Sequence, residues 1–378
     1  MLHPDESPGG ASLYKKWSGV KMKFIHCSDL HLGAEPEQGT PWAEARKNEL
    51  WQTFERILEV CNNDNVDLLL ISGNLFHKQP LLYEVRQLNE MFAGLKSTKV
   101  VFIAGNHDYV SPRSKYRNFQ WADNVIMLSD RDMQEVYVYG LDTTVYGFSY
   151  VESEITAPLY RDVKPKQSSG IHILLAHGGE PKYVPIDFDR MAESGFDYIA
   201  LGHSNTPRCF DNNMYYSGSP EPITPNDTGA HGYVKGEFTK SGKDYKLTTE
   251  FVPFAQRSYL DIHVRVSAED TNATVSRYIT EEMLKNGAGN MYRIYLEGIR
   301  GADILFDKEA IAMKGMITEV IDSTVLDYNY DELRLANADN IIGAFINNIS
   351  ELEEEDSLKD SALYYGIDAL LKASDRNR

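Results

Sequence analysis

The chain has 378 residues, of which 42% are hydrophobic and 25% charged, a composition typical of a soluble globular protein large enough for two domains. Its 56 acidic residues outnumber its 38 basic ones, and the resulting net charge of −18 excludes nucleic-acid binding by overall electrostatic attraction. No apolar run approaches the roughly 20 residues of a membrane span, and the first residues lack the apolar segment of a secretory signal.

The first 21 residues are predicted to form a flexible extension. They are rich in Pro, Gly and Ser, and the first strand-like apolar pattern starts only at Met22. Met22 is therefore a candidate for the native start, with the preceding segment a mis-called start or an addition made for expression.

From Met22 onward, apolar runs that predict strands alternate with segments of helical spacing. The predicted strands are residues 23–28, 66–72, 99–104, 144–148, 171–176 and 198–201. Helical stripes of apolar residues lie between the first three strands, at residues 42–63 and 80–96. A β-α-β-α-β series of this kind predicts a sheet with helices packed on it.

The pattern changes after residue 256. Residues 259–266 alternate apolar and polar side chains, as a half-exposed strand does. A helical segment through Leu284, two strands near residues 291–296 and 316–321, and two helices at 340–352 and 357–373 follow. We predict a main domain at residues 22–256 and a smaller α+β domain with helices at its C-terminal end at residues 257–378.

Short polar motifs follow the predicted strands. They are Asp29-Leu30-His31, Gly73-Asn74, Gly105-Asn106-His107-Asp108, His177-Gly178 and Gly202-His203-Ser204-Asn205. Asp, Asn and His are ligands for hard or borderline metal ions, and ligands of an open α/β sheet bind at the carboxyl ends of its strands. A single His after a strand is usually a packing residue, whereas five motifs in the same position predict a metal site.

These motifs resemble those of a known family. The order DxH, GD, GNH, H, GHxH is typical of the calcineurin-like metallophosphoesterases. The segments MKFIHCSDLHLG, ISGNLFHKQPLL and VVFIAGNHDY resemble more narrowly the nuclease subunit of bacterial SbcC–SbcD complexes, and GSPEPITPNDTGAHGY resembles its YhaO-like branch. The resemblance implies an α/β metallophosphoesterase sandwich, two sheets flanked by helices, followed by a small α+β capping domain.

The resemblance also implies roles for individual residues. Asp29 and His31 would hold one metal ion, Asn74 occupies the position of the bridging ligand, and Asn205 that of a further ligand of the first ion. The ligands of the second ion would be Asn106, His177 and His203. The catalytic residues would be His107, as the general acid, and Asp108, which would orient it. His77 is either a partner of the metal ligands or a residue that hydrogen-bonds near a helix start.

Two positions depart from the family pattern. Asn74 stands where the family has a bridging aspartate, and Asn205 where it has the last histidine of GHxH. Two divalent ions about 3.5–4 Å apart repel each other by on the order of 16 kcal/mol at an effective dielectric of about 20. A neutral Asn offsets none of that repulsion, so we expect weak metal binding, with Asp227 a candidate compensating acid.

The favoured function is a Mn²⁺-dependent phosphodiesterase, the DNA repair exonuclease subunit of an SbcCD-like complex, with a degenerate two-metal site. The implied partners are DNA and an SMC-like ABC ATPase. A homodimer is allowed, and no membrane is involved. The cysteines, without CxxC spacing, favour a reducing cytoplasmic setting. Two alternatives stay open, a catalytically impaired subunit that binds DNA ends and a phosphodiesterase for small molecules.

Overall fold

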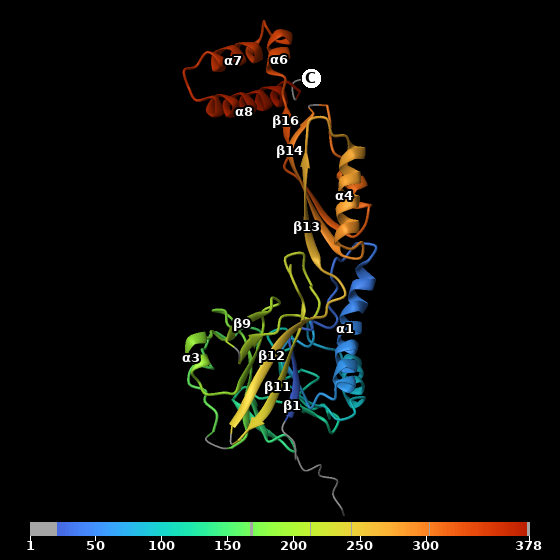
Figure 1. The fold of residues 1–378 in the computed structure, drawn as a ribbon, viewed down its shortest axis with the longest axis vertical. Helices are drawn as coiled ribbons and strands as arrows, with labels where there is room; N and C mark the ends of the chain where they lie inside the picture. Colours follow the sequence, from blue (N-terminus) through green and yellow to red (C-terminus); the bar gives the residue numbers. More distant parts are fainter. Residues whose placement is uncertain (1–20, 167–168, 212, 243, 302, 376–378) are drawn as a thin grey trace, which may run out of the picture. The chain divides into compact units, whose positions relative to one another are not determined.

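The computed structural model describes residues 21–166, 169–211, 213–242, 244–301 and 303–375 (Figure 1). The predicted flexible extension lies outside the described residues except for Lys21, which begins the first strand. The chain divides into two compact units, residues 1–260 and 261–378. Across the described ranges, no helix combines the length and the apolar character that a bilayer crossing requires.

The first unit contains two six-stranded sheets. In spatial order, the first sheet consists of β12 (Asp244–Pro253), β11 (Gly232–Ser241), β1 (Lys21–Cys27), β2 (Leu68–Ser72), β3 (Lys99–Ile103) and β4 (Val125–Met127). The second consists of β5 (Gln134–Val138), β6 (Thr143–Gly147), β7 (Ile171–His177), β8 (Tyr198–Gly202), β10 (Met214–Tyr216) and β9 (Arg208–Asp211). The strands β1 to β4 run parallel, as do β6, β7, β8 and β10. The predicted two-sheet sandwich flanked by helices is confirmed.

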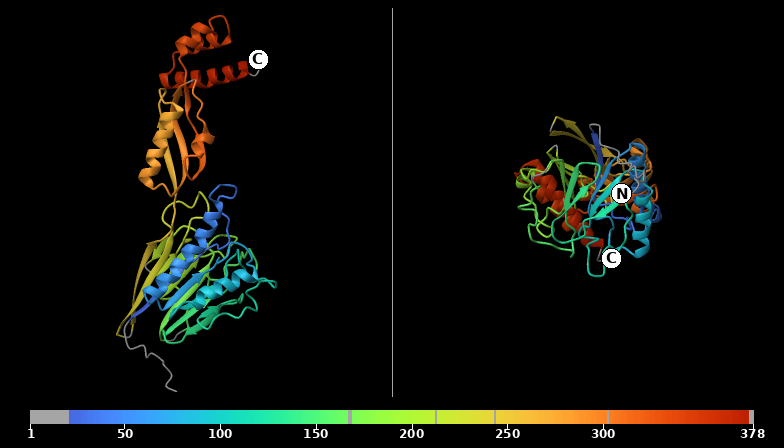
Figure 2. Two further views of the ribbon diagram at one scale, coloured as in Figure 1. Left: turned by 90° about the vertical axis from the view of Figure 1, so that its right-hand side faces the viewer. Right: turned by 90° about the horizontal axis from the view of Figure 1, so that it is seen from below.

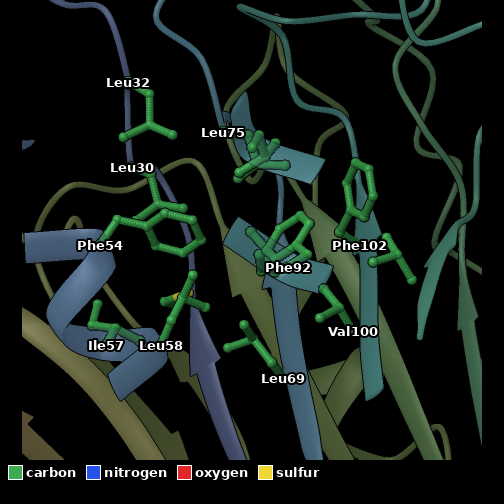
Figure 3. Packing of buried hydrophobic residues seen from close by; sticks show 14 of the residues in the cluster. Leu30, Leu32, Phe54, Ile57, Leu58, Leu69, Leu75, Phe92, Val100 and Phe102 are labelled. Carbon is green, nitrogen blue, oxygen red and sulfur yellow. The ribbon is translucent and has the colours of Figure 1, made fainter. Parts of the chain in front are cut away.

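Helices α1 (Ala43–Asn63) and α2 (Leu82–Ala93) pack on the outer face of the first sheet (Figure 2). Phe54 and Ile57 of α1 belong to one apolar cluster with Leu69 of β2, Phe92 of α2 and Val100 of β3, and Figure 3 shows Val100 next to Phe92. Full burial of each such side chain contributes about 1.5–3 kcal/mol. The helical spacing of apolar residues in the sequence thus marks the face of each helix that packs on the sheet.

A second core lies between the two sheets. Strands β2 and β7 are buried at every residue, which explains their continuous apolar sequences. His26 of β1 is the polar exception that matters here, with Nδ1 3.0 Å from the hydroxyl of Tyr198 and Nε2 2.8 Å from Oγ of Ser72. Burial lowers the pKa of His26 to about 3, so the imidazole joins the two sheets in its neutral form.

The hairpin of β11 and β12 is absent from the sequence-based prediction, which places no strand between residues 202 and 259. Each strand has ten residues, and β11 pairs antiparallel with β1, so the hairpin extends the first sheet. Most of β12 is exposed or half-exposed, and its Lys and Thr residues weaken the apolar signal. The short strands β4, β5, β9 and β10 and the short helix α3 (Phe188–Ala192) also escape prediction.

The second unit has a four-stranded sheet and helices. The sheet contains β13 (Tyr259–Val266), β14 (Met291–Gly301), β15 (Ile317–Asp322) and β16 (Val325–Asp327). Two helices, α4 (Asn272–Asn286) and α5 (Lys308–Ala312), lie between these strands in the sequence. The hydroxyl of Tyr292 on β14 donates to the carbonyl of Met283 in α4 at 3.1 Å. Helices α6 (Tyr330–Ala336), α7 (Ile341–Ser350) and α8 (Asp356–Asp375) pack around Ile346, Leu363 and Ile367.

Candidate metal centre

The polar motifs lie where the central strands of both sheets end. Asp29 and His31 follow β1, Asn74 follows β2, Asn106 follows β3, His177 ends β7 and His203 follows β8. Four of these residues have left-handed backbone conformations, with φ of 51° at Asp29, 44° at His31, 53° at Asn74 and 104° at His203. Non-glycine residues at positive φ store on the order of 1–3 kcal/mol each and cluster at functional sites. The chain therefore turns sharply after β1, β2 and β8.

Asp29 holds two of these turns together. Its fully buried carboxylate accepts the side-chain amide of Asn74 through Oδ1 at 2.9 Å and the backbone N–H of His203 through Oδ2 at 2.8 Å. Burial raises the pKa of Asp29, while hydrogen bonds and the neighbouring His203 act in the opposite direction. A single carboxylate thus ties the first sheet to the loop after β8 of the second sheet.

The side-chain NH₂ group of Asn74 points at the side-chain oxygens of Asp29 and Asn106. Its Oδ1 accepts the backbone N–H of His107 at 3.0 Å, and because that N–H can only donate, the orientation of the amide is fixed. Its Nδ2 consequently donates to Oδ1 of Asp29 and to Oδ1 of Asn106, at 2.9 and 3.2 Å. In this conformation Asn74 presents donor hydrogens, so it does not fit the role of a bridging ligand.

His177 presents a free lone pair to the site. Its Nδ1 lies 2.8 Å from the carbonyl oxygen of Ser72, which can only accept, so Nδ1 carries the hydrogen. Burial lowers the pKa of His177 to about 3, and the ring is therefore neutral with its lone pair on Nε2. That lone pair faces Oδ1 of Asn106 at 2.9 Å, and the oxygen is an acceptor too.

Asn106, His177 and His203 consequently fit a cation. Two ligand atoms about 2.1 Å from one ion at a right angle are roughly 3 Å apart, which is the separation of His177 Nε2 and Asn106 Oδ1. Nδ1 of His203 lies 3.3 Å from the same oxygen, and burial followed by the neighbouring His177 lowers the pKa of His203 to about 4. A divalent ion among these three side chains would relieve the repulsion between facing lone pairs.

His107 is oriented by a different group from the one expected. Its Nδ1 donates to the backbone carbonyl of His77 at 2.8 Å, which leaves Nε2 directed elsewhere. The carboxylate of Asp108 instead accepts the backbone N–H of Gly105 at 2.8 Å and the hydroxyl of Tyr116 at 2.9 Å. Asp108 therefore shapes the turn that carries His107. A backbone carbonyl carries no sequence signature, so this partner could not be read from the motif.

Asn205 and Asp227 pair with each other. Within the described residues, Nδ2 of Asn205 reaches the two carboxylate oxygens of Asp227 at 3.3 and 3.4 Å. Asp227 also accepts the backbone N–H groups of Ile223 and Thr224 at 3.0 and 2.8 Å, so it closes its own turn. Asp227 therefore shapes the turn of its own loop and contacts the candidate ligand position Asn205.

His77 lies among the site histidines. Its Nδ1 is 3.3 Å from Nδ1 of His31, and its ring stacks on that of His107 with the ring centroids 5.3 Å apart. Helix α2 begins at Leu82, five residues later, so His77 is not its N-cap. Of the two interpretations left open by the sequence, the structure favours the one that places His77 beside the candidate ligands.

The glycine before Asn74 offers a test of how this site is built. A Cβ on Gly73 would overlap Nδ1 of His177, and the backbone there has a φ of 98°. Gly140, with a φ of 87°, has no described atom within 4 Å of such a Cβ and serves as a control for backbone strain alone. We expect Gly73→Ala to lower the free energy of unfolding by about 1–3 kcal/mol more than Gly140→Ala, measured by urea unfolding of metal-free protein. Equal losses would show that the overlap with His177 is absent.

A two-sheet α/β sandwich with Asp, Asn and His side chains gathered at the strand ends is the architecture of a metal-dependent phosphoesterase. Residues 22–207 match the family model described as calcineurin-like phosphoesterase. This part of the chain is a calcineurin-like metallophosphoesterase domain.

Similar proteins extend the match beyond these residues. The uncharacterized metallophosphoesterase YhaO of Bacillus subtilis is 22% identical to this chain over 377 residues, and the match covers 89% of each chain. The DNA double-strand break repair protein Mre11 of Methanopyrus kandleri is 26% identical, covering 66% of this chain but only 60% of that protein. Mre11 of Sulfolobus acidocaldarius is 23% identical, covering 73% of this chain and 75% of that protein.

Proposed function

We propose that the chain is a metal-dependent phosphodiesterase that acts as the DNA nuclease subunit of an SbcCD-like complex, with Mn²⁺ as the metal. The proposal rests on two acceptor atoms that face each other, Nε2 of His177 and Oδ1 of Asn106, with His203 beside them. Relatives named for DNA double-strand break repair support DNA as the substrate. An SMC-like ABC ATPase would be the partner, and residues 257–378 would form the capping domain.

Asn106, His177 and His203 would hold one metal ion, and Asp29 and His31 would contribute to a second position. When bound, such ions acidify water and neutralise phosphate charge. His107 would supply the proton to the leaving oxygen from Nε2, because its Nδ1 is held by the carbonyl of His77. The imidazole is half-exposed, so a substrate could reach it.

The orientation of Asn74 supports a second candidate function, that of a catalytically impaired subunit that binds DNA ends. Its NH₂ group donates hydrogen bonds to Oδ1 of Asp29 and to Oδ1 of Asn106. Metal ions would otherwise bind these two oxygens. A metal ion bound to either oxygen competes with these hydrogen bonds, and Asn74 lacks the charge of the bridging aspartate that it replaces. The two candidates therefore differ in turnover and share the fold.

The experiment that separates them measures hydrolysis of bis-p-nitrophenyl phosphate and of a linear DNA duplex by the full chain at saturating Mn²⁺. Hydrolysis that falls at least 100-fold in His107→Ala and in His177→Ala would support the phosphodiesterase. His263→Ala serves as the control, because His263 is exposed and lies in the second unit. DNA binding without hydrolysis of either substrate would favour the impaired subunit. Hydrolysis that persists in both site variants would overturn the site assignment.

A further inference from the structure

Three imidazoles gather beside the Asn106–His177–His203 position. His31, His77 and His107 come from the loops that follow β1, β2 and β3, and one ring nitrogen of each lies within 4.8 Å of the others. His31 is buried, whereas His77 and His107 are half-buried at the protein surface. Ions from solvent can therefore reach the cluster without opening the core.

The spacing of the first pair is that of zinc ligands. Nδ1 of His31 and Nδ1 of His77 are 3.3 Å apart. In a tetrahedral zinc site with Zn–N bonds of about 2.0–2.1 Å, neighbouring nitrogens are roughly 3.3–3.4 Å apart. The same separation is compatible with a simple hydrogen bond between the rings, so a third ligand is needed to distinguish a metal site.

His107 has the features of that third ligand. Its Nδ1 donates to the backbone carbonyl of His77 at 2.8 Å, and its Nε2 is the nitrogen left for a metal. Zinc-binding histidines almost always donate their other ring N–H to a carbonyl or carboxylate in this way. The rings of His31 and His107 meet edge to face, with their centroids 4.8 Å apart, and His107 is only half-buried.

The cluster shares His31 with the proposed second metal position, but its set of ligand atoms differs from that of a two-metal site. It offers three nitrogen donors, and the nearby carboxylate of Asp29 is committed to Asn74 and His203, with its Oδ1 3.8 Å from Nε2 of His31. Imidazole ligands suit zinc and similar borderline ions, whereas carboxylate and carbonyl oxygens suit Mn²⁺ and Mg²⁺. Asn74, which accepts the backbone N–H of His107, stands where the family has a carboxylate, so one ligand group suited to Mn²⁺ is missing next to this cluster.

We propose that His31, His77 and His107 form a zinc-binding site, and that zinc bound there inhibits phosphodiester hydrolysis. Nε2 of His107 cannot bind zinc and carry a transferable proton at the same time, so zinc binding removes the general acid. Zinc binding itself is independent of the proposed function, while the inhibition rests on it.

Direct binding tests the site. The metal-stripped chain is titrated with Zn²⁺ against a chromophoric chelator and with Co²⁺ by visible absorption. We expect His77→Ala and the larger His77→Gln to lower the affinity for one Zn²⁺ equivalent at least tenfold and to weaken the Co²⁺ bands, while His263→Ala changes neither. Circular dichroism shows that each variant is folded. A wild-type chain that binds no Zn²⁺, or a His77→Gln isotherm that superimposes on the wild-type one, would overturn the proposal.

A second measurement separates zinc inhibition from the proposed function. Zn²⁺ is added to the Mn²⁺-supplemented chain during hydrolysis of bis-p-nitrophenyl phosphate, and we expect His77→Gln to need at least tenfold more Zn²⁺ for half-inhibition. If the chain shows no hydrolysis with Mn²⁺, the proposed function and the inhibition both fail, whereas the binding result still decides the zinc site. Hydrolysis that is unaffected by zinc bound through His77 would refute the inhibition alone.

Discussion

The double variant Asn74→Asp with Asn205→His is expected to bind Mn²⁺ more tightly than the natural chain and to hydrolyse bis-p-nitrophenyl phosphate at least 100-fold faster. The physical reason is charge. A carboxylate at position 74 offers an oxygen to each of two ions and offsets part of their mutual repulsion, which is on the order of 16 kcal/mol at an effective dielectric of about 20. The amide in the natural chain instead donates to Asp29 and Asn106.

Without metal, the Asn74→Asp substitution should lower the thermal stability of the protein. Asn74→Asp replaces a donor by an anion that faces the buried carboxylate of Asp29, so the melting temperature should fall without metal and rise above that of the natural chain with Mn²⁺. Differential scanning calorimetry with EDTA and with Mn²⁺ measures this crossing. His107→Ala should remove most of the gained activity. A natural chain that already binds two Mn²⁺ ions tightly and matches the double variant in rate would refute this account of both positions.

Replacement of Arg46 by Met is expected to cost about 3–5 kcal/mol of unfolding free energy. Arg46 is fully buried at the start of α1, where its guanidinium donates to Glu49 at 2.6 Å and to the carbonyl of Pro222 at 2.6 Å. It also lies 3.4 Å from a carboxylate oxygen of Glu37 and 3.5 Å from one of Glu221. Met keeps much of the buried volume but leaves these acids without their cation.

The loss should depend on pH with a definite sign. Burial already raises the pKa values of Glu37 and Glu221, and Arg46 opposes that shift. Without Arg46 these pKa values rise further, so the folded variant takes up protons before the unfolded chain does, and its deficit shrinks as pH falls. Urea unfolding at pH 8 and pH 5.5 measures this difference. Lys47→Ala, which removes an exposed ion pair with Glu35, should leave stability unchanged. An Arg46→Met deficit that is the same at both pH values would contradict this explanation.

The sequence predicted the parts of the molecule that have a strong local signal. The strands from β1 to β3 and the helices α1 and α2 have apolar periodicity that burial imposes, and their predicted positions agree with the structure to within a few residues. Strands β11 and β12 lack that signal. β12 is an edge strand with polar side chains on its exposed face. Their place in the first sheet depends on pairing with β1, which lies about 200 residues earlier in the chain.

The candidate site could likewise be predicted only in part from the sequence. Side-chain types at strand ends can be read from a sequence, and the structure places Asn74 in contact with both Asp29 and Asn106. The orientation of the Asn74 amide depends on the backbone N–H of His107, and the tautomer of His177 depends on the carbonyl of Ser72. Backbone groups that lie close only after folding determine what each side chain presents to a metal, and no motif encodes them.

The pairing of β1 with β11 also has a consequence for how the chain can fold during synthesis. β1 leaves the ribosome well before its antiparallel neighbour, Gly232–Ser241, which follows about 200 residues later. The hydrogen bond from His203 to Asp29 likewise spans 174 residues. Contacts this distant in sequence make folding slow, because a long loop must close before they form. The ribosome must release nearly the whole first unit before either sheet or metal site is complete, and until then the open edge of β1 needs protection from pairing with other chains.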